Sequence, residues 1–311
     1  MSTASEPVSL PSGAREFVGH GPDMPAVSWP DGARVAVSLV VNYEEGSERT
    51  PLYGDPSAEG MGEGFAVPPG TRDLRNESHF DYGSRVGHWR ILEILNRHRV
   101  AATYFACGMA LELNPEAAAS ITASGHEVAG HGYRWLPLNA LSAEEEAQAI
   151  ADATAAIEET TGERPTGWFS RGPTPRTRTL LQQQGYTYDC DAFSEDLPYT
   201  ISLNGEPWTV VPYAFHTNDM KYLRPPGYSS PDDFYYQLRD AFDRLHAEGA
   251  SQPQMMSIGL HLRHTGRPER AEALDRFLTH ATACDGVWFA RRREIAQWWR
   301  DHYGHLRVMR S

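Results

Sequence analysis

The sequence predicts an α/β fold in which a mainly parallel sheet curls into an irregular (β/α) barrel. Short apolar runs alternate with segments whose apolar residues have helical spacing. The run ARVAVSLVVNY at 33–43 is almost continuously apolar and rich in β-branched residues, as expected of a strand buried on both faces. The alternation repeats about seven times, which favours a barrel of about seven strands over a doubly wound sheet.

Local signals define several of the elements. Asn114 before Pro115 is typical of the first residues of a helix. Ser142 and Glu145 form a capping-box pattern, and Gly162 ends the same helix. The expected helices cover 86–99, 114–125, 142–162, 177–185, 231–249 and 268–286; the strands that follow 33–43 are expected at 101–108, 126–131, 166–170, 187–193, 209–215, 255–262 and 287–292.

Composition narrows the function classes. The 311 residues carry a net charge of −13, which repels phosphate backbones, so no nucleic-acid partner is expected. No stretch approaches the ~18 apolar residues of a membrane span, and no secretory signal is visible, so a cytoplasmic protein without a membrane partner is expected. The three cysteines are far apart and lack zinc-site spacing. We expect an N-terminal extension at 1–25 and one catalytic barrel at 26–305 that acts on a small-molecule substrate.

Polar side chains gather where the expected strands end. Glu44 and Glu45 follow the first strand, His131 ends another, Arg171 follows 166–170, and His261 lies near the end of 255–262. Catalytic residues of such barrels lie at the carboxyl ends of the strands. Each residue alone is more often structural, but their convergence on one rim predicts a site. Because adjacent carboxylates raise one another's pKa, one glutamate is a candidate general base.

Several segments together carry a resemblance to a known family. These are VNYEEGSE (41–48), YGSRVGHWRILEIL (82–95), GHEVAGHGYRW (125–135), DAFSEDLPY (191–199), HTNDMKY (216–222) and MMSIGLHLRHTGRP (255–268). The chain resembles the polysaccharide deacetylase superfamily (carbohydrate esterase family four), and within it the metal-independent allantoinases and cyclic-imide hydrolases. The resemblance runs from about Arg34 to Trp299 and implies the same irregular barrel. It also implies a homo-oligomer, often a tetramer in this subgroup.

The resemblance also bears on whether the site holds a catalytic metal ion. Metal-dependent members have an Asp-Asp pair after the first strand and a His-x-x-x-His pair, which together supply a base and three ligands. Here the acids align with Glu44 and Glu45, and the histidines with His131 and Trp135. A zinc hydrolase normally needs three protein ligands, and one of them is a tryptophan in this chain. We therefore expect no catalytic metal and no cofactor.

The expected reaction is metal-independent hydrolysis of a C–N bond in a small cyclic amide of the allantoin, hydantoin or cyclic-imide class. Glu44 or Glu45 would activate water, and His131, His261 and Arg171 are candidates to polarise the carbonyl or protonate the leaving nitrogen. The individual roles stay open at this point. An imide carbonyl is an easier target than an ordinary amide because its nitrogen lone pair is shared between two acyl groups.

The substrate-binding residues are predicted from side-chain chemistry. Tyr133, Trp135 and Trp168 are expected to wall a pocket for a planar ring, and Asn218 and Asp219 to hydrogen-bond the NH and CO groups of that ring. His216 and the order Arg171-Gly172 depart from the allantoinase pattern. These departures argue against allantoin itself as the substrate; a cyclic imide, another hydantoin, a dihydropyrimidine-like ring or an amide specific to a secondary pathway fits equally well.

Two alternatives come from other classes. The first is a metal-dependent deacetylase acting on a sugar or a small N-acetyl compound, with Glu45, His131 and either His261 or His216 as ligands. The second is a degenerate barrel that binds a ligand without turnover. The retained acids and His261 argue against the second alternative.

Overall fold

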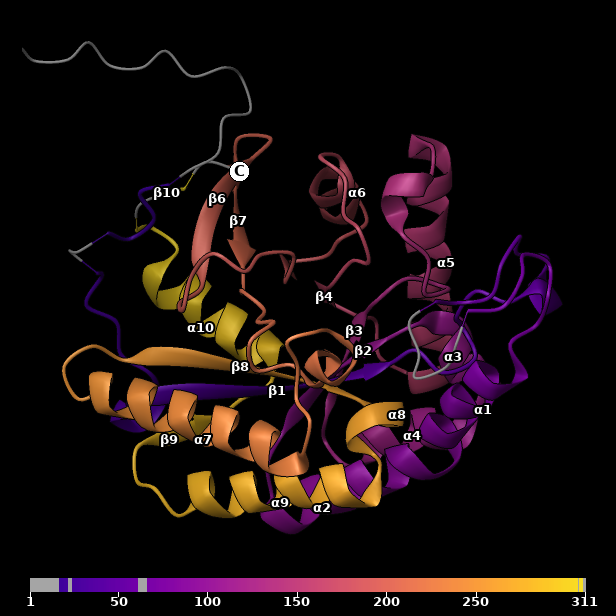
Figure 1. Cartoon of the computed structure of the whole chain (residues 1–311). Helices are drawn as coiled ribbons and strands as arrows, with labels where there is room; N and C mark the ends of the chain where they lie inside the picture. The colour runs from indigo at the N-terminus through magenta and orange to yellow at the C-terminus, as the bar shows by residue number, and fades with distance from the viewer. Residues whose placement is uncertain (1–16, 22–23, 61–65, 307, 310–311) are drawn as a thin grey trace, which may run out of the picture.

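A curled, mainly parallel sheet forms the centre of the computed structural model, which describes residues 17–21, 24–60, 66–306 and 308–309 (Figure 1). Its strands are β1 (Val35–Tyr43), β2 (Ala102–Ala106), β3 (Glu127–Gly130), β4 (Gly167–Trp168), β5 (Tyr188–Asp189), β6 (Tyr199–Leu203), β7 (Glu206–Val210), β8 (Gln254–His261), β9 (Val287–Phe289) and β10 (Val308–Met309). The hydrogen-bonded order is β10-β6-β7-β5-β4-β3-β2-β1-β8, with β9 beside β1. Among the described strands, β6 and β7 are the one antiparallel pair, so the strands from β8 to β7 form one parallel path.

Helices cover the sheet as the sequence predicts. They are α1 (Leu74–Tyr82), α2 (His88–His98), α3 (Gly108–Leu113), α4 (Pro115–Ala123), α5 (Ala143–Thr161), α6 (Thr177–Gln183), α7 (Pro231–Glu248), α8 (Leu262–Thr265), α9 (Pro268–Thr282) and α10 (Arg292–Tyr303). Figure 1 shows α2, α7 and α9 packed together along one side of β1 and β8. The α/β class and the barrel-like parallel sheet are thereby confirmed.

Alternation along β1 decides which side chains can reach the site. Val37, Val41 and Tyr43 belong to the core that packs against the outer helices. Ala36 and Val40 belong to the core inside the curl, together with side chains of β2, β5 and α10. Because successive side chains of a strand point to opposite faces, the even-numbered positions at the end of β1 face the inside.

The capping signals are confirmed. The Asn114 side chain accepts the Ala117 N–H at 3.1 Å, and Ser142 and Glu145 form a reciprocal capping box at the start of α5. Gly162 ends α5 in the left-handed region with φ 75°. These are local interactions, which is why they can be predicted from neighbouring residues alone.

Several features differ from the prediction. The strands expected at 166–170, 187–193 and 209–215 are shorter than predicted, because the chain leaves the sheet after Trp168, Asp189 and Val210. Four helices, α1, α3, α8 and α10, were not predicted. The β6–β7 hairpin was not predicted either; it turns through Asn204 and Gly205 with φ 53° and 87°. The sheet begins at β10 and ends at β8, and among the described residues these two strands do not pair with each other. The barrel is therefore open, whereas the sequence favoured a closed one.

Within the described residues, no helix combines the length and the apolar character that a bilayer crossing requires. Most of the predicted extension at 1–25 lies outside the described residues.

Candidate active site

A cavity of about 510 Å³ lies where β1, β3, β4 and β8 end. Its lining combines the predicted catalytic residues with an apolar wall. The residues that line it are Asn42, Glu44, His131, Trp135, Phe169, Ser170, Arg171, Gly172, Tyr213, Phe215, Asn218, Met220, Lys221, Arg224 and His261. The carboxyl ends of the parallel strands have thus brought Glu44, His131, Arg171 and His261 to one space, as predicted.

Glu44 is the carboxylate that faces this cavity. It is 1% exposed, and its Oε1 lies 3.2 Å from His131 Nε2 and 3.6 Å from His261 Nε2. Its Oε2 lies 2.9 Å from Arg263 Nη1. Burial opposes ionisation, but the charges of Arg263 and His261 and the hydrogen bond with His131 outweigh it and hold the pKa of Glu44 well below its usual range. Glu44 is therefore ionised at neutral pH.

Glu45 points elsewhere, as the alternation along β1 requires. Its Oε2 accepts the Glu44 backbone N–H at 2.8 Å, and a Cβ at Gly83, after helix α1, would collide with its carboxyl group. Burial raises the pKa of Glu45 to about 7; the Arg263 charge opposes this shift and the Glu44 charge adds to it. Glu45 does not line the cavity. The choice between the two glutamates, left open by the sequence, therefore favours Glu44.

The tautomer of His131 follows from its partners. Nδ1 lies 2.7 Å from the Phe169 carbonyl oxygen, which can only accept, so Nδ1 carries a hydrogen. When Nε2 carries no hydrogen, its lone pair can accept a hydrogen bond from a protonated Glu44; while Glu44 is ionised, a hydrogen bond between the two groups needs a hydrogen on Nε2. A proton that arrives on Glu44 can consequently be hydrogen-bonded by His131. The Phe169 ring stacks on the imidazole at 5.2 Å between centroids and keeps it in this orientation.

His261 is held as an imidazolium. Its Nδ1 lies 2.6 Å from Asp219 Oδ1, while Asp219 Oδ2 accepts the Thr265 hydroxyl at 2.6 Å. Burial lowers the pKa of His261, but the charges of Asp219 and Glu44 outweigh burial and raise it to about 9. Asp219 is fully buried behind His261 and lies outside the cavity lining, so it orients the histidine; the sequence had suggested that it binds the ring of the substrate.

Arg171 lines the cavity next to Trp135. Its guanidinium carbon lies 3.8 Å from the centroid of the Trp135 ring, and its Nη1 donates to the Trp135 carbonyl at 2.8 Å. Both carboxylate oxygens of Glu59 accept hydrogen bonds from Arg171, Oε2 from Nη1 at 2.7 Å and Oε1 from Nη2 at 3.2 Å. Three of the five N–H groups of a guanidinium are thereby engaged, which leaves two for another acceptor.

The residues of the site that the sequence missed include Asn42, Tyr213 and Arg263. Tyr213 accepts the side-chain N–H groups of Asn42 at 3.0 Å and of Asn218 at 3.1 Å, so its own O–H hydrogen remains to be donated. Arg263 lies directly behind Glu44. Asn42 could have been found from its even-numbered position at the end of β1, but no local pattern marks Tyr213 or Arg263.

Two predicted aromatic wall residues lie outside the cavity. Trp168 is fully buried in the core and packs so closely on Gly130 that a Cβ there would collide with its ring. The Tyr133 hydroxyl donates to Glu112 at 2.9 Å beside a separate pocket of about 280 Å³ next to α5. Trp135 and Phe169 form this part of the wall instead.

We expect Trp168→Phe to lower the free energy of unfolding by roughly 1–3 kcal/mol and to leave KM unchanged, because the indole packs in the core and does not reach the cavity. Urea unfolding and steady-state kinetics check this. Unchanged stability with a raised KM would show that Trp168 contacts substrate.

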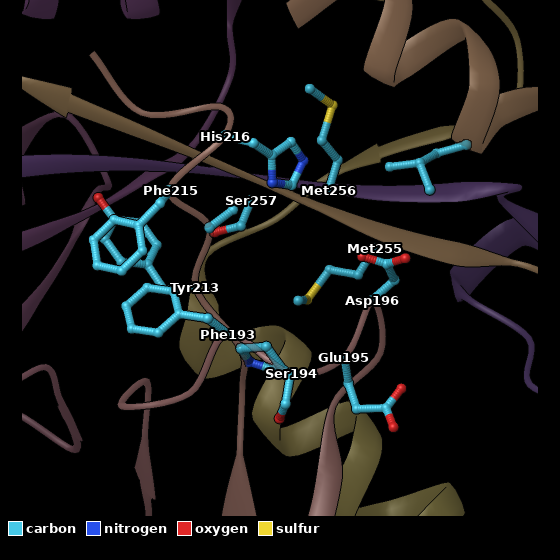
Figure 2. Close-up of a pocket in the computed structure, with 13 residues that line it drawn as sticks. Phe193, Ser194, Glu195, Asp196, Tyr213, Phe215, His216, Met255, Met256 and Ser257 are labelled. Atoms are coloured by element: carbon cyan, nitrogen blue, oxygen red, sulfur yellow. The ribbon is translucent and has the colours of Figure 1, made fainter. Parts of the chain in front are cut away.

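His216 lies in a neighbouring cavity of about 470 Å³. Figure 2 shows its ring near Ser257 and Met256, with Glu195 and Asp196 on the opposite side of the cavity. Tyr213 and Phe215 line both cavities. His216 is thus separated from Glu44 by this aromatic wall and is not brought to the site.

The side chains near Glu44 do not fit a catalytic metal of the kind that the metal-dependent members of the superfamily hold. The Arg263 guanidinium already occupies the space beside both glutamates, at 2.9 Å from Glu44 Oε2 and 3.5 Å from Glu45 Oε1. The aligned position of a further ligand is Trp135, whose ring contacts Arg171. Among the described residues, no three His, Cys, Asp or Glu side chains are placed to hold a metal ion.

Comparisons with known proteins agree with the fold. The polysaccharide deacetylase family model matches residues 77–188. A putative polysaccharide deacetylase of Schizosaccharomyces pombe is 38% identical over 92% of this chain and 96% of its own length. The crystal structure of Puue allantoinase is 40% identical, with a TM-score of 0.91 over 96% of this chain and 100% of that chain. A probable polysaccharide deacetylase from Pseudomonas aeruginosa PAO1 is 41% identical, with a TM-score of 0.89 over 94% and 99%.

The likeness to a solved allantoinase supports placement near the allantoinase-like members, and members of carbohydrate esterase family four are hydrolases. The S. pombe relative covers nearly the whole of both chains at 38% identity. The chain therefore belongs to the polysaccharide deacetylase family.

Proposed function

We propose that this chain hydrolyses a C–N bond of a small cyclic amide, of the hydantoin, allantoin or cyclic-imide class, without a catalytic metal. The observation that carries the proposal is the placement of a carboxyl group and an imidazole at one cavity: Glu44 Oε1 lies 3.6 Å from His261 Nε2, and both residues line the cavity. The direction of their pKa shifts suits Glu44 as the base and His261 as the acid. The 40% identity to a protein named Puue allantoinase supports the choice of a cyclic amide.

In the first step Glu44 accepts a proton from water as the water oxygen attacks the ring carbonyl. A carboxylate with a low pKa is a weak base, so the acquired proton needs a partner. His131 supplies one when its Nε2 carries no hydrogen, because Nε2 lies 3.2 Å from Glu44 Oε1 and can then accept a hydrogen bond from the protonated carboxyl group. General-base catalysis of this kind contributes ~10²–10⁴-fold.

Charge that develops on the carbonyl oxygen requires a hydrogen-bond donor. The Tyr213 hydroxyl is suited to this role because it lines the cavity and both side-chain donors around it are already directed at its oxygen. Burial raises the pKa of Tyr213 above its usual range, so it keeps its proton. A donor fixed in this way contributes about 2.7–4 kcal/mol to transition-state stabilisation.

Collapse of the tetrahedral intermediate breaks the C–N bond, and His261 Nε2 gives its proton to the leaving nitrogen. Asp219 keeps the ring oriented and compensates the charge of the imidazolium before this transfer. Glu44 then releases the proton that it took from water, and His261 regains a proton from solvent, which restores the starting state of both groups.

Arg171 is the proposed binding group for a ring carbonyl at the cavity wall. We expect Arg171→Lys to raise KM about ten- to a hundredfold with a smaller change in kcat, because lysine cannot stack on Trp135 and also reach Glu59 and a substrate oxygen. Steady-state kinetics on the preferred ring measure the split. A fall in kcat at constant KM would assign Arg171 to the chemical step.

A substrate panel tests the proposed function. It contains allantoin, hydantoin, succinimide, dihydrouracil and an N-acetyl sugar, and ring opening or acetate release is followed on protein of known metal content. We expect opening of at least one ring and no acetate release. Release of acetate with no ring opening would support a deacetylase instead.

A further inference from the structure

Arg263 lies in the interior between the two glutamates. It is 1% exposed and comes from the short helix α8, immediately after β8. Its Nη1 lies 2.9 Å from Glu44 Oε2 and 3.5 Å from Glu45 Oε1. A buried arginine needs a negatively charged partner, because its guanidinium stays charged at all accessible pH values.

These contacts are close, but the atoms do not align as hydrogen bonds. Within the described residues, Nε, Nη1 and Nη2 of Arg263 have no hydrogen-bond partner, and the same holds for Glu44 Oε2 and Glu45 Oε1. The attraction is therefore that of charges at short range in a buried environment. A cation bound by two carboxylates in this manner acts on them largely as a point charge.

Aromatic rings keep the guanidinium in place. Its carbon lies 4.3 Å from the centroid of Phe80 and 5.3 Å from that of Trp135. Trp135 has Arg171 at 3.8 Å as a second cation. The tryptophan is thus in contact with the charge behind Glu44 and with the arginine that lines the cavity.

We propose that Arg263 is a positioning residue that takes the place of a metal ion: a fixed internal cation that keeps Glu44 ionised and occupies the space in which a divalent ion would contact Glu44 and Glu45. The inference rests on the proposed function in its claim that the reaction runs without a metal. The new claim is that Arg263 supplies the positive charge that a metal ion would otherwise place beside Glu44. Arg263 does not line the cavity, so it acts through Glu44 and does not contact substrate.

Other charged groups near Glu44 also influence its pKa. His261 adds a second positive charge, whereas Glu45 opposes it. The groups that face Glu44 or Arg263 from the surrounding elements are His131, His261, Glu45, Glu48, Cys107, Tyr213 and Asp219. Arg263 is the cation nearest to an oxygen of Glu44, so its removal has the largest expected effect on the ionisation of Glu44.

The pH dependence of kcat/KM is the first test, with Arg263→Met as the variant. We expect the acid limb to move up by about one pH unit or more, because an opposite charge at this distance shifts a carboxyl pKa by 1–3 units. Arg267→Met is the matched control: Arg267 is four residues further on and also stacks on an aromatic ring, that of Tyr82, at 3.6 Å. An acid limb that moves no more in Arg263→Met than in the control would overturn the proposal.

Arg263→Lys covers the case in which Arg263→Met fails to fold. A lysine keeps the charge but lacks the planar fork that reaches both carboxylates, so the limb is expected to move in the same direction by a smaller amount. An acid limb that moves by more than one pH unit, although the positive charge is kept, would contradict the proposal.

Zinc binding is the second test and needs no activity. We expect equilibrium dialysis to show little zinc on the unmodified chain, and about one zinc per chain on the double variant Arg263→Ala, Trp135→His, which frees the space and adds a ligand. Equal zinc binding by both folded proteins would overturn the proposal. If none of the rings in the substrate panel is opened, the proposed function is wrong, but the zinc-binding result still tests the role of Arg263.

Discussion

Glu44→Gln is expected to lower kcat ~10²–10⁴-fold and to leave KM within a few-fold of the unmodified value, because the amide cannot accept a proton from water. The amide still fills the space between His131 and His261, so the fold is expected to persist. Steady-state kinetics on the preferred ring, with circular dichroism to verify folding, measure the effect.

Glu45→Gln is the matched comparison. Its amide oxygen can still accept the Glu44 N–H, and its side chain is turned towards Gly83, so we expect a loss of no more than roughly tenfold. If Glu45→Gln were the more damaging substitution, the assignment of the base to Glu44 would be wrong.

The two glutamates also differ in the pH range in which they ionise. A base with a pKa well below the usual carboxyl range leaves kcat/KM level from pH 8 down through pH 6. A base with a pKa of about 7 would instead make kcat/KM fall tenfold per pH unit below that value. The position of the acid limb therefore separates Glu44 from Glu45 without any substitution.

His261→Asn is expected to lower kcat by a similar factor, ~10²–10⁴-fold. An asparagine amide can replace Nδ1 as the donor to Asp219 but has no acidic proton for the leaving nitrogen. The fall in kcat is expected to be smallest for rings whose nitrogen is the best leaving group, such as an imide. Comparison of an imide with dihydrouracil measures this difference, and an equal loss on both would argue against the role of general acid.

His264→Asn is the control for this substitution. The His264 ring lies 5.8 Å from that of His261 on the same turn, but it does not line the cavity. We expect kcat to change little in this variant. A loss equal to that in His261→Asn would point to a disturbance of the turn and not to lost proton transfer.

The alkaline limb of the pH profile reports on His261. Its pKa is raised to about 9, so the protonated form is present below that pH and is lost as the pH rises through it. Asp219→Asn removes the largest of the influences that raise this pKa, so we expect the limb to move to lower pH. A limb that stays in place would mean that another group limits activity at high pH.

Much of the site follows from the sequence because it lies at strand ends. Glu44, His131, Arg171 and His261 were each placed at or just after the end of a recognisable apolar strand, and parallel strands bring such ends together. The capping residues of α5 were equally predictable, since their contacts are local.

Other features depend on contacts between distant segments. Trp168 and Phe169 are adjacent aromatics, and only the register of β4 decides that Phe169 reaches the cavity while Trp168 enters the core. Arg263 lies two residues after His261, but its pairing with Glu44 spans most of the chain. The β6–β7 hairpin could have been found, because Asn-Gly between two strand-like runs is a strong turn signal.

Hydrolysis of the preferred cyclic amide by metal-stripped protein, followed as zinc is added back, is the most direct test of the account. We predict a turnover rate that is the same at well below one metal ion per chain and at saturating zinc, with Glu44→Gln inactive under both conditions. A rate that is lost on stripping and returns in proportion to bound zinc would contradict the assignment of Arg263 and Glu44, and would show that the reaction depends on a metal.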